Sequence, residues 1–241
     1  MIPIYRSSID SSLPRWKRTV DIVLSAVALP VLGVLMVVQF MVTIVSPGPV
    51  FFRQIRVGHQ GRRFCLYKFR TMCVSAPTAV HQAHLSELIK SNMPMQKLDS
   101  RDTRLIPGGW FWRATGLDEL PQIINVLRGE MSIVGPRPCI PYEYDEYSSA
   151  QRQRLNSVPG LTGLWQVSGK NRTTFDQMVQ LDVAYAQRCC AWLDFKIILT
   201  TLPAICGQVI EMQCARRLAG TPAATSSVLN DVEPGLLRKA V

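Results

Sequence analysis

A single apolar stretch, residues 20–45, constrains the fold of this chain more than any other feature. Its only polar side chains are those of Asp21, Ser25, Gln39 and Thr43. A helix of this composition is hydrophobic on every side, and it is long enough to fill the core of a bilayer, which needs about 20 apolar helical residues. A secretory signal fits less well, because the run is too long and the segment after it has no small-residue cleavage site. We therefore expect a membrane helix.

Both flanks of this stretch are basic, which bears on how it sits in the membrane. Arg15 and Arg18 precede it, and Arg53 and Arg56 follow it. The positive-inside rule keeps both flanks on the cytoplasmic side. Pro30 lies within the run, where it lacks an amide hydrogen and breaks or bends a helix. These features predict a re-entrant helix-break-helix that enters one leaflet and returns, and a single kinked span is the alternative.

The rest of the chain predicts a mainly helical α+β fold. Two β-rich segments flank a glycine-containing turn at 58–63 and predict a small hairpin. Helices are expected at 83–90, 118–127 and 180–205, and Trp192 and Phe195 make the last of these suited to a membrane interface. The predicted organisation is a basic N-terminal segment at 1–19, the membrane helix at 20–45, a main domain at 46–205 and a mostly disordered tail at 206–241.

The net charge of +10 indicates a polyanionic partner, but it does not choose among nucleic acid, an anionic membrane and phosphorylated substrates. The apolar stretch, and the lack of any helix-turn-helix or aromatic RNA-binding signature, argue against nucleic acid. The seven cysteines form no C-x-x-C motif and indicate free thiols in a reducing compartment. The pair His81 and His84 lies on a polar stretch and is expected to be solvated rather than metal-bound.

Two adjacent acids, Asp118 and Glu119, stand two residues before Pro121. Proline is tolerated only in the first turn of a helix, so both acids are expected at a helix N-terminus. Thr115 and Asp118 also have the spacing of a capping box, so a simple helix start is one explanation for the pair.

The neighbouring motifs favour chemistry instead. Arg137 lies between two prolines in a Gly-Pro-Arg-Pro turn, which would present a planar cation suited to phosphate oxygens. Lys68 and Arg70 are two residues apart on the hairpin and are expected to meet substrate phosphate from one face, or else to hold anionic lipid headgroups. Carboxylates beside a phosphate site call for a divalent cation such as Mg²⁺, and a carboxylate aimed at a diphosphate can act as a nucleophile.

Four blocks carry a more specific resemblance. They are "GPVFFRQIRVGHQGRRFCLYKFRTM", "LDELPQIINVLRGEMSIVGPRP", "PGLTGLWQVSG" and "LDVAYAQRCCAWLDFKIIL". In this order, from about Lys17 to Ile205, the chain resembles the bacterial sugar transferase family, the monotopic phosphoglycosyl transferases.

The resemblance implies an enzyme of the bacterial inner membrane with its catalytic domain, here 46–205, on the cytoplasmic face. Such enzymes transfer a sugar 1-phosphate from a UDP-sugar to polyprenyl (undecaprenyl) phosphate and release UMP, in exopolysaccharide, capsule, O-antigen or glycan assembly. It implies Mg²⁺, a re-entrant helix, a covalent phosphosugar on the first acid of the dyad, and inner-membrane lipids as surroundings. Carried over to this sequence, the roles are nucleophile for Asp118, metal-side partner for Glu119, phosphate binding for Arg137, active-site acids for Asp182 and Asp194, and a metal-side acid after the turn for Glu143.

The chain departs from the family pattern at two places. Gly116 stands where a hydroxyl residue often precedes the dyad, and Leu29 precedes Pro30 where a serine is common. A non-catalytic, membrane-anchored scaffold of a polysaccharide assembly complex is the alternative function. The sequence leaves the transferred sugar and homo-oligomerisation open.

Overall fold

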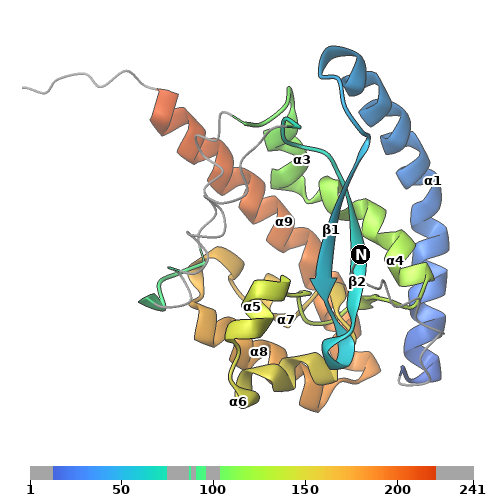
Figure 1. Cartoon of the computed structure of the whole chain (residues 1–241), viewed down its shortest axis with the longest axis vertical. Coiled ribbons are helices and arrows are strands. Elements are labelled where there is room, and N and C mark those ends of the chain that lie inside the picture. The colour runs from blue at the N-terminus through green and yellow to red at the C-terminus, as the bar shows by residue number, and fades with distance from the viewer. Residues whose placement is uncertain (1–12, 75–86, 88–90, 96–103, 221–241) are drawn as a thin grey trace, which may run out of the picture.

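A computed structural model describes residues 13–74, 87, 91–95 and 104–220 of the chain. Most of these residues are helical, and the predicted mainly helical fold with a small hairpin is confirmed (Figure 1). Apart from Glu87, the predicted helix at 83–90 lies outside the described residues, as does the end of the predicted tail, 221–241. The elements are α1 Arg15–Val45, β1 Phe51–Val57, η1 His59–Gly61, β2 Arg63–Phe69, α3 Gly109–Thr115, η3 Leu117–Gln122, α4 Ile123–Leu127, β3 Ser132–Val134, α5 Pro141–Glu146, α6 Ser149–Arg152, η4 Gln153–Asn156, β4 Gly160–Thr162, α7 Leu164–Val167, η5 Lys170–Arg172, α8 Phe175–Arg188 and α9 Ala191–Gly220.

The apolar stretch forms one long helix, α1, which begins at Arg15, five residues earlier than expected. It continues through Pro30, so the predicted break is absent and the helix instead curves along its length (Figure 1). Pro30 is exposed, so no neighbouring element opposes the bend that a proline requires. One stripe of α1 is buried against the domain, and four of its five residues are polar; the stripe consists of Lys17, Asp21, Ser25, Leu32 and Gln39. The other faces expose valine, isoleucine, methionine and phenylalanine side chains.

Contacts at both ends fasten α1 to the domain. Near its start, the Lys17 ammonium pairs with Asp194 and donates to the Tyr185 hydroxyl at 2.9 Å and to the Val134 carbonyl at 2.8 Å. Near its end, the Gln39 amide donates to the Arg70 carbonyl at 2.7 Å. The helix therefore lies along the domain rather than projecting from it.

The predicted hairpin is present as an antiparallel pair, in whose register Phe51 faces Phe69 and Val57 faces Arg63. Its turn uses left-handed backbone at Gln60 and Gly61. Phe69 packs against Trp112 of α3 and Leu32 of α1, so the base of the hairpin is buried between two helices.

A second, parallel pair joins β3 to β4 and brings two distant motifs together. Gly135 donates its amide to the Thr162 carbonyl at 2.8 Å, and Gly160 donates to the Pro136 carbonyl at 2.8 Å. The two backbones are so close that a Cβ on Gly135 would stand 2.3 Å from the Val158 carbonyl oxygen. Only glycine fits there, which explains the residue that opens the Gly-Pro-Arg-Pro turn.

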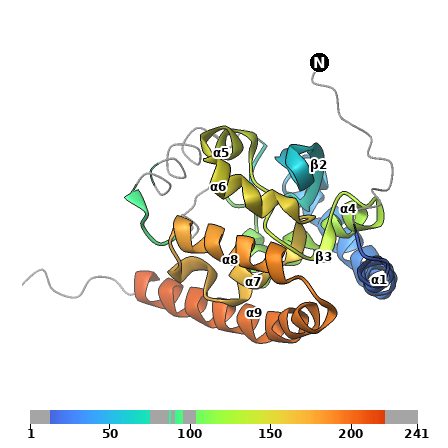
Figure 2. The same cartoon turned by 90° about the horizontal axis from the view of Figure 1, so that it is seen from below.

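The C-terminal part of the domain consists of α8 and α9. In Figure 2, α9 lies beneath α8, and α1 is seen end-on beside the other elements. Exposed apolar side chains follow one stripe of α9, namely Trp192, Phe195, Leu199, Leu202 and Ile210. By length and composition, α1 and residues 191–210 of α9 are each able to cross a membrane. Because α9 runs to Gly220, residues 206–220 are helical rather than part of a disordered tail.

Candidate active site

The dyad begins a helical segment, as Pro121 predicted, although the first turns are of the 3₁₀ type. Asp118 and Glu119 lie in the first turn of η3, which leads into α4. The capping-box explanation is wrong, because Thr115 ends α3 and its hydroxyl donates to the Phe111 carbonyl at 2.8 Å. Gly116 separates the two helices in a left-handed conformation with φ of 71°, which glycine adopts without strain.

The two acids have different environments, as adjacent helical residues must. Asp118 is buried, with 8% of its surface exposed. Glu119 is half-buried, and its Oε1 lies 2.7 Å from the Lys68 ammonium of β2. Asn125 holds this segment to the hairpin by accepting from the Tyr67 amide at 3.2 Å and donating to the Cys65 carbonyl at 2.7 Å. The structure therefore joins two predicted site residues, Lys68 and Glu119.

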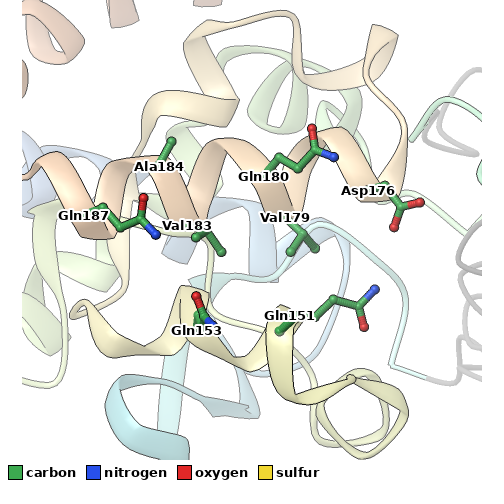
Figure 3. Close-up of a pocket in the computed structure, with 9 residues that line it drawn as sticks. Gln151, Gln153, Asp176, Val179, Gln180, Val183, Ala184 and Gln187 are labelled. Carbon is green, nitrogen blue, oxygen red and sulfur yellow. The ribbon is translucent and has the colours of Figure 1, made fainter.

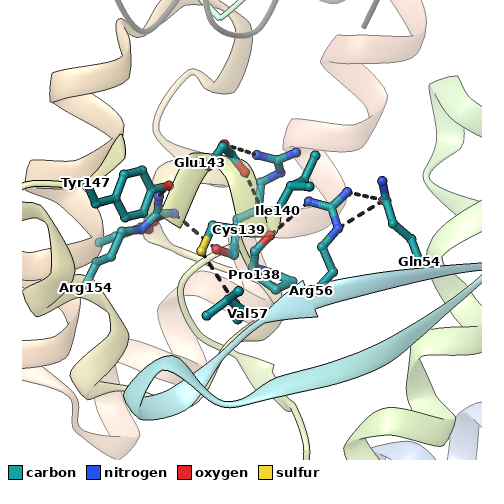
Figure 4. Close-up of polar contacts among 11 residues, drawn as sticks. Gln54, Arg56, Val57, Pro138, Cys139, Ile140, Glu143, Tyr147 and Arg154 are labelled. Carbon is teal, nitrogen blue, oxygen red and sulfur yellow. Dashed lines mark hydrogen bonds and ion pairs between the residues drawn. The ribbon is translucent and has the colours of Figure 1, made fainter. Parts of the chain in front are cut away.

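The Pro-Arg-Pro turn is held by its carbonyl groups. Pro136 and Pro138 have no amide hydrogen, so the turn offers few donors of its own. Its three successive carbonyls each accept from a different element: Pro136 from the Gly160 amide, Arg137 from Arg154 Nη2 at 3.1 Å, and Pro138 from Arg56 Nη1 at 3.1 Å. These contacts fix the backbone on both sides of the Arg137 side chain, and Figure 4 shows the one between Arg56 and Pro138.

Glu143 lies against Arg137 rather than in a cluster with the dyad. Its carboxylate is fully buried, with Oε2 accepting from the Ile140 amide at 2.6 Å and Oε1 lying 3.6 Å from Arg137 Nη1. The register of this acid after the turn, which the sequence left uncertain, thus makes it the partner of the arginine in the turn.

Asp182 reaches the turn through an intermediary. In α8 it pairs with Arg154, and both side chains are buried. Arg154 also donates to the Tyr147 hydroxyl at 2.8 Å and to the Arg137 carbonyl. Burial raises the pKa of Asp182 to about 6, although the attraction of Arg154 opposes the shift. Through Arg154, Asp182 therefore helps to hold the Arg137 carbonyl of the turn in place.

Two predicted residues lie in other contacts. Arg70 comes just after β2 and is buried, and its guanidinium donates to the carbonyls of Pro49 and Ser46. It fastens the link between α1 and the hairpin. Asp194 is held by Lys17 and by the Tyr185 hydroxyl, which donates to it at 2.7 Å, and it fastens α1 to α9.

Two arginines at the turn had not been predicted as site residues. Arg56 had been counted only as a flanking charge, although its place in the strand beside the hairpin turn could have drawn attention to it. Arg154 gave no signal, because it lies in a polar stretch without a motif. Arg56 is buried, and its charge acts on both Glu119 and Arg137. Lys68 contacts Glu119 and Arg56 donates to the Pro138 carbonyl, so the hairpin touches both the dyad and the Pro-Arg-Pro turn.

The chemistry of the dyad fits Mg²⁺. The two carboxylates supply hard oxygen ligands, and Mg²⁺ in sites that bind phosphorylated substrates typically takes one or two carboxylates together with substrate phosphates. Among the described residues there is no group of three or more His, Cys, Asp or Glu that could hold a metal. Phosphate oxygens and water would complete the coordination.

A separate shallow cavity lies between α6, η4 and α8 (Figure 3). Its walls carry amide side chains over an apolar floor, and none of the dyad or turn residues lines it; the lining residues are Ala150, Gln151, Gln153, Asp176, Val179, Gln180, Val183, Ala184 and Gln187. It is not part of the site described above.

Comparison with known proteins shows the family of the chain. The family model described as bacterial sugar transferase matches residues 13–208, which is most of the chain. The chain belongs to the bacterial sugar transferase family.

Curated relatives show how far the similarity extends. A galactosyl transferase, CpsE, of Streptococcus agalactiae is 43% identical over 78% of this chain and 42% of its own length. The exopolysaccharide production protein ExoY of Sinorhizobium fredii is 39% identical over 79% of this chain and 85% of its own length. A UDP-glucose:undecaprenyl-phosphate glucose-1-phosphate transferase of Xanthomonas campestris is 40% identical over 78% of this chain and 38% of its own length. The chain thus spans less than half of two of these relatives and most of the third.

Proposed function

We propose that this protein is a phosphoglycosyl transferase that moves a sugar 1-phosphate from a UDP-sugar to polyprenyl phosphate and releases UMP. The observation that carries the proposal is that the hairpin contacts both the acidic dyad and the Pro-Arg-Pro turn, through the ion pair of Lys68 with Glu119 and the hydrogen bond from Arg56 to the Pro138 carbonyl. Relatives named for this reaction, including the glucose-1-phosphate transferase, support the same activity. The reaction would begin the assembly of an exopolysaccharide or a related glycan.

The proposed reaction has two steps. An oxygen of Asp118 attacks the β-phosphorus of the UDP-sugar, the bond from that phosphorus to the oxygen shared with the α-phosphate breaks, and UMP leaves with that oxygen. A phosphate oxygen of polyprenyl phosphate then attacks the same phosphorus, and the carboxylate of Asp118 is released. Arg137 holds phosphate oxygens as negative charge develops on them. Glu119, oriented by Lys68, stays beside the nucleophile.

Mg²⁺ is part of the proposal. When bound by Asp118 and Glu119, it would neutralise charge on the diphosphate of the donor. Glu143 already accepts from the Ile140 amide and faces Arg137, so we assign it to the orientation of Arg137 rather than to the metal.

We also propose that α1, as one curved helix without a break, enters and leaves the membrane on the same side, and that the domain faces the cytoplasm. Its basic flanks and the contacts of Lys17 and Gln39 with the same domain support placing both ends on one side of the membrane. The exposed apolar faces of α1 and α9 would lie in lipid. A lipid-linked acceptor would then reach the site from the bilayer, while the soluble donor reaches it from the cytoplasm.

The test is UMP release by the purified protein with polyprenyl phosphate, Mg²⁺ and a panel of UDP-sugars. Asp118→Asn should lower the rate by about 10³-fold or more, because it removes the nucleophile. It should also abolish a covalent phosphosugar adduct detectable by mass spectrometry. Asp145→Asn, which changes an exposed acid of α5, is the matched control and should keep full activity.

An Asp118→Asn variant with undiminished transfer would refute the assignment of the nucleophile. A wild-type protein that releases no UMP from any donor in the panel would instead support the scaffold alternative.

A further inference from the structure

Arg56 is a buried cation held in an unusual way. It is the second-last residue of β1, and 6% of its surface is exposed. Its Nε and Nη2 both donate to Gln54 Oε1, at 3.1 and 2.7 Å, and its Nη1 donates to the Pro138 carbonyl (Figure 4). The adjacent backbone adds a further link, because the Val57 amide donates to the Cys139 carbonyl at 2.9 Å. The end of β1 is thus joined to the residues that follow Arg137.

No carboxylate forms an ion pair with Arg56 in the part of the chain that the structure describes. Its hydrogen-bond partners, an amide and a carbonyl, are both neutral. Burial and the nearby charge of Arg137 lower the pKa of Arg56 to about 10, and the charges of Glu143 and Glu119 offset only part of this shift, so Arg56 remains charged at neutral pH. A buried charge without an ionic partner is costly, and two neighbouring guanidinium groups repel each other. An anion bound by Arg137 would relieve that repulsion.

The contacts of Arg56 need an arginine. One edge of the guanidinium donates twice to Gln54, and the remaining nitrogen reaches Pro138. A lysine carries the same charge, but its ammonium group has no fixed planar fork and does not reproduce this geometry. The substitution Arg56→Lys therefore keeps the positive charge and removes the hydrogen-bond geometry of the guanidinium.

We propose that Arg56 is a positioning residue for the phosphates of the donor. It fixes the Pro138 side of the turn that carries Arg137, and it adds a positive charge that favours an anion there. This inference rests on the proposed function, because it assigns the ligand of Arg137 as the diphosphate of a UDP-sugar.

The test measures binding of UDP-glucose and UDP-galactose by isothermal titration calorimetry in an Asp118→Asn background, which cannot turn over. Arg56→Lys should weaken binding of the donor about tenfold, the size of effect expected when hydrogen bonds to a charged group are lost. Arg53→Lys, an exposed arginine on the same strand, is the matched control and should bind as the parent does.

A double-mutant cycle with Arg137→Lys separates positioning from a general structural role. If Arg56 acts through Arg137, the double variant should bind no more weakly than Arg137→Lys alone. Losses that multiply, or an Arg56→Lys variant that binds like the parent, would overturn the inference. If Arg56→Lys has no melting transition, Gln54→Ala takes its place, because it removes only the acceptor that orients the guanidinium.

Failure of the proposed function would look different. Wild-type protein that binds UDP-sugar but releases no UMP would contradict the proposed reaction, and the binding cycle would still decide the role of Arg56.

Discussion

The ion pair between Lys17 and Asp194 predicts a large loss of stability when the lysine alone is removed. Lys17→Met keeps a similar length while removing an ammonium group with 2% of the side chain exposed and three partners. Asp194 would then keep only the Tyr185 hydroxyl, whose single proton it shares with the Val134 carbonyl. Tyr185 therefore cannot replace the lost ammonium.

The size of the loss follows from this burial. Removing one partner of a buried ion pair costs about 3–5 kcal/mol, because the other charge is left without compensation. For a domain of this size, 1 kcal/mol corresponds to a shift in Tm of about 2–4 °C. The melting temperature of Lys17→Met should thus fall by roughly 6–20 °C. Tryptophan fluorescence during heating of detergent-solubilised protein would measure it.

Two further variants make the reasoning testable. Arg15→Met removes an exposed cation from the start of the same helix and should change Tm by at most a few degrees. Lys17→Met combined with Asp194→Leu replaces the pair by apolar groups and should be more stable than Lys17→Met alone. The argument would be refuted if Lys17→Met had the same Tm as Arg15→Met. It would also be refuted if the double variant lost as much stability as the two single variants together.

Two other sites give sharp expectations. Gly135→Ala should destabilise the protein and lower its activity by tenfold or more, about 1.4 kcal/mol or more, because the added Cβ meets the Val158 carbonyl. The control is Gly207→Ala, whose Cβ meets nothing within 4 Å and which should be neutral or stabilising. Melting and activity assays would measure both variants. Burial raises the pKa of the Cys139 thiol to about 11, so iodoacetamide at pH 8 should leave it unmodified while labelling the exposed Cys73, as peptide mass spectrometry would show. Rapid labelling of Cys139 in the folded protein would contradict the second expectation. A Gly135→Ala protein with the same Tm and activity as Gly207→Ala would contradict the first.

Sequence patterns predicted local structure well where the cause is local. The hairpin followed from β-rich segments around a glycine turn, and the position of the dyad followed from Pro121. The same reasoning erred at Pro30, because whether a proline ends a helix depends on what surrounds it. Pro30 in α1 and Pro203 in α9 are both exposed within continuous helices. A bend at these positions meets no opposing element.

Partners that are distant in sequence were less predictable. Lys68 and Arg70 share a strand face by the two-residue rule, yet Lys68 meets Glu119 while Arg70 meets Ser46 and Pro49. Alternation along a strand predicts the side on which a residue lies, and tertiary packing decides what it touches there. The same limit applies to Lys17, whose partner Asp194 is 177 positions away.

Part of the positive charge of the chain has a structural role. Among the described residues, five cationic side chains donate to backbone carbonyls at turns, strand ends and the end of α4; they are Lys17, Arg18, Arg56, Arg70 and Arg154. Charged donors suit such carbonyls, because each makes a stronger hydrogen bond than a neutral donor. Part of the net charge therefore holds the fold together, which is why charge alone could not identify the partner. The ion pairs of Lys17 with Asp194 and of Arg154 with Asp182 are buried, whereas the side chains of Lys68 and Arg137, which lie beside Glu119 and Glu143, are 22% and 26% exposed. Under the proposed function, we expect these two cations to exchange that contact for a phosphate.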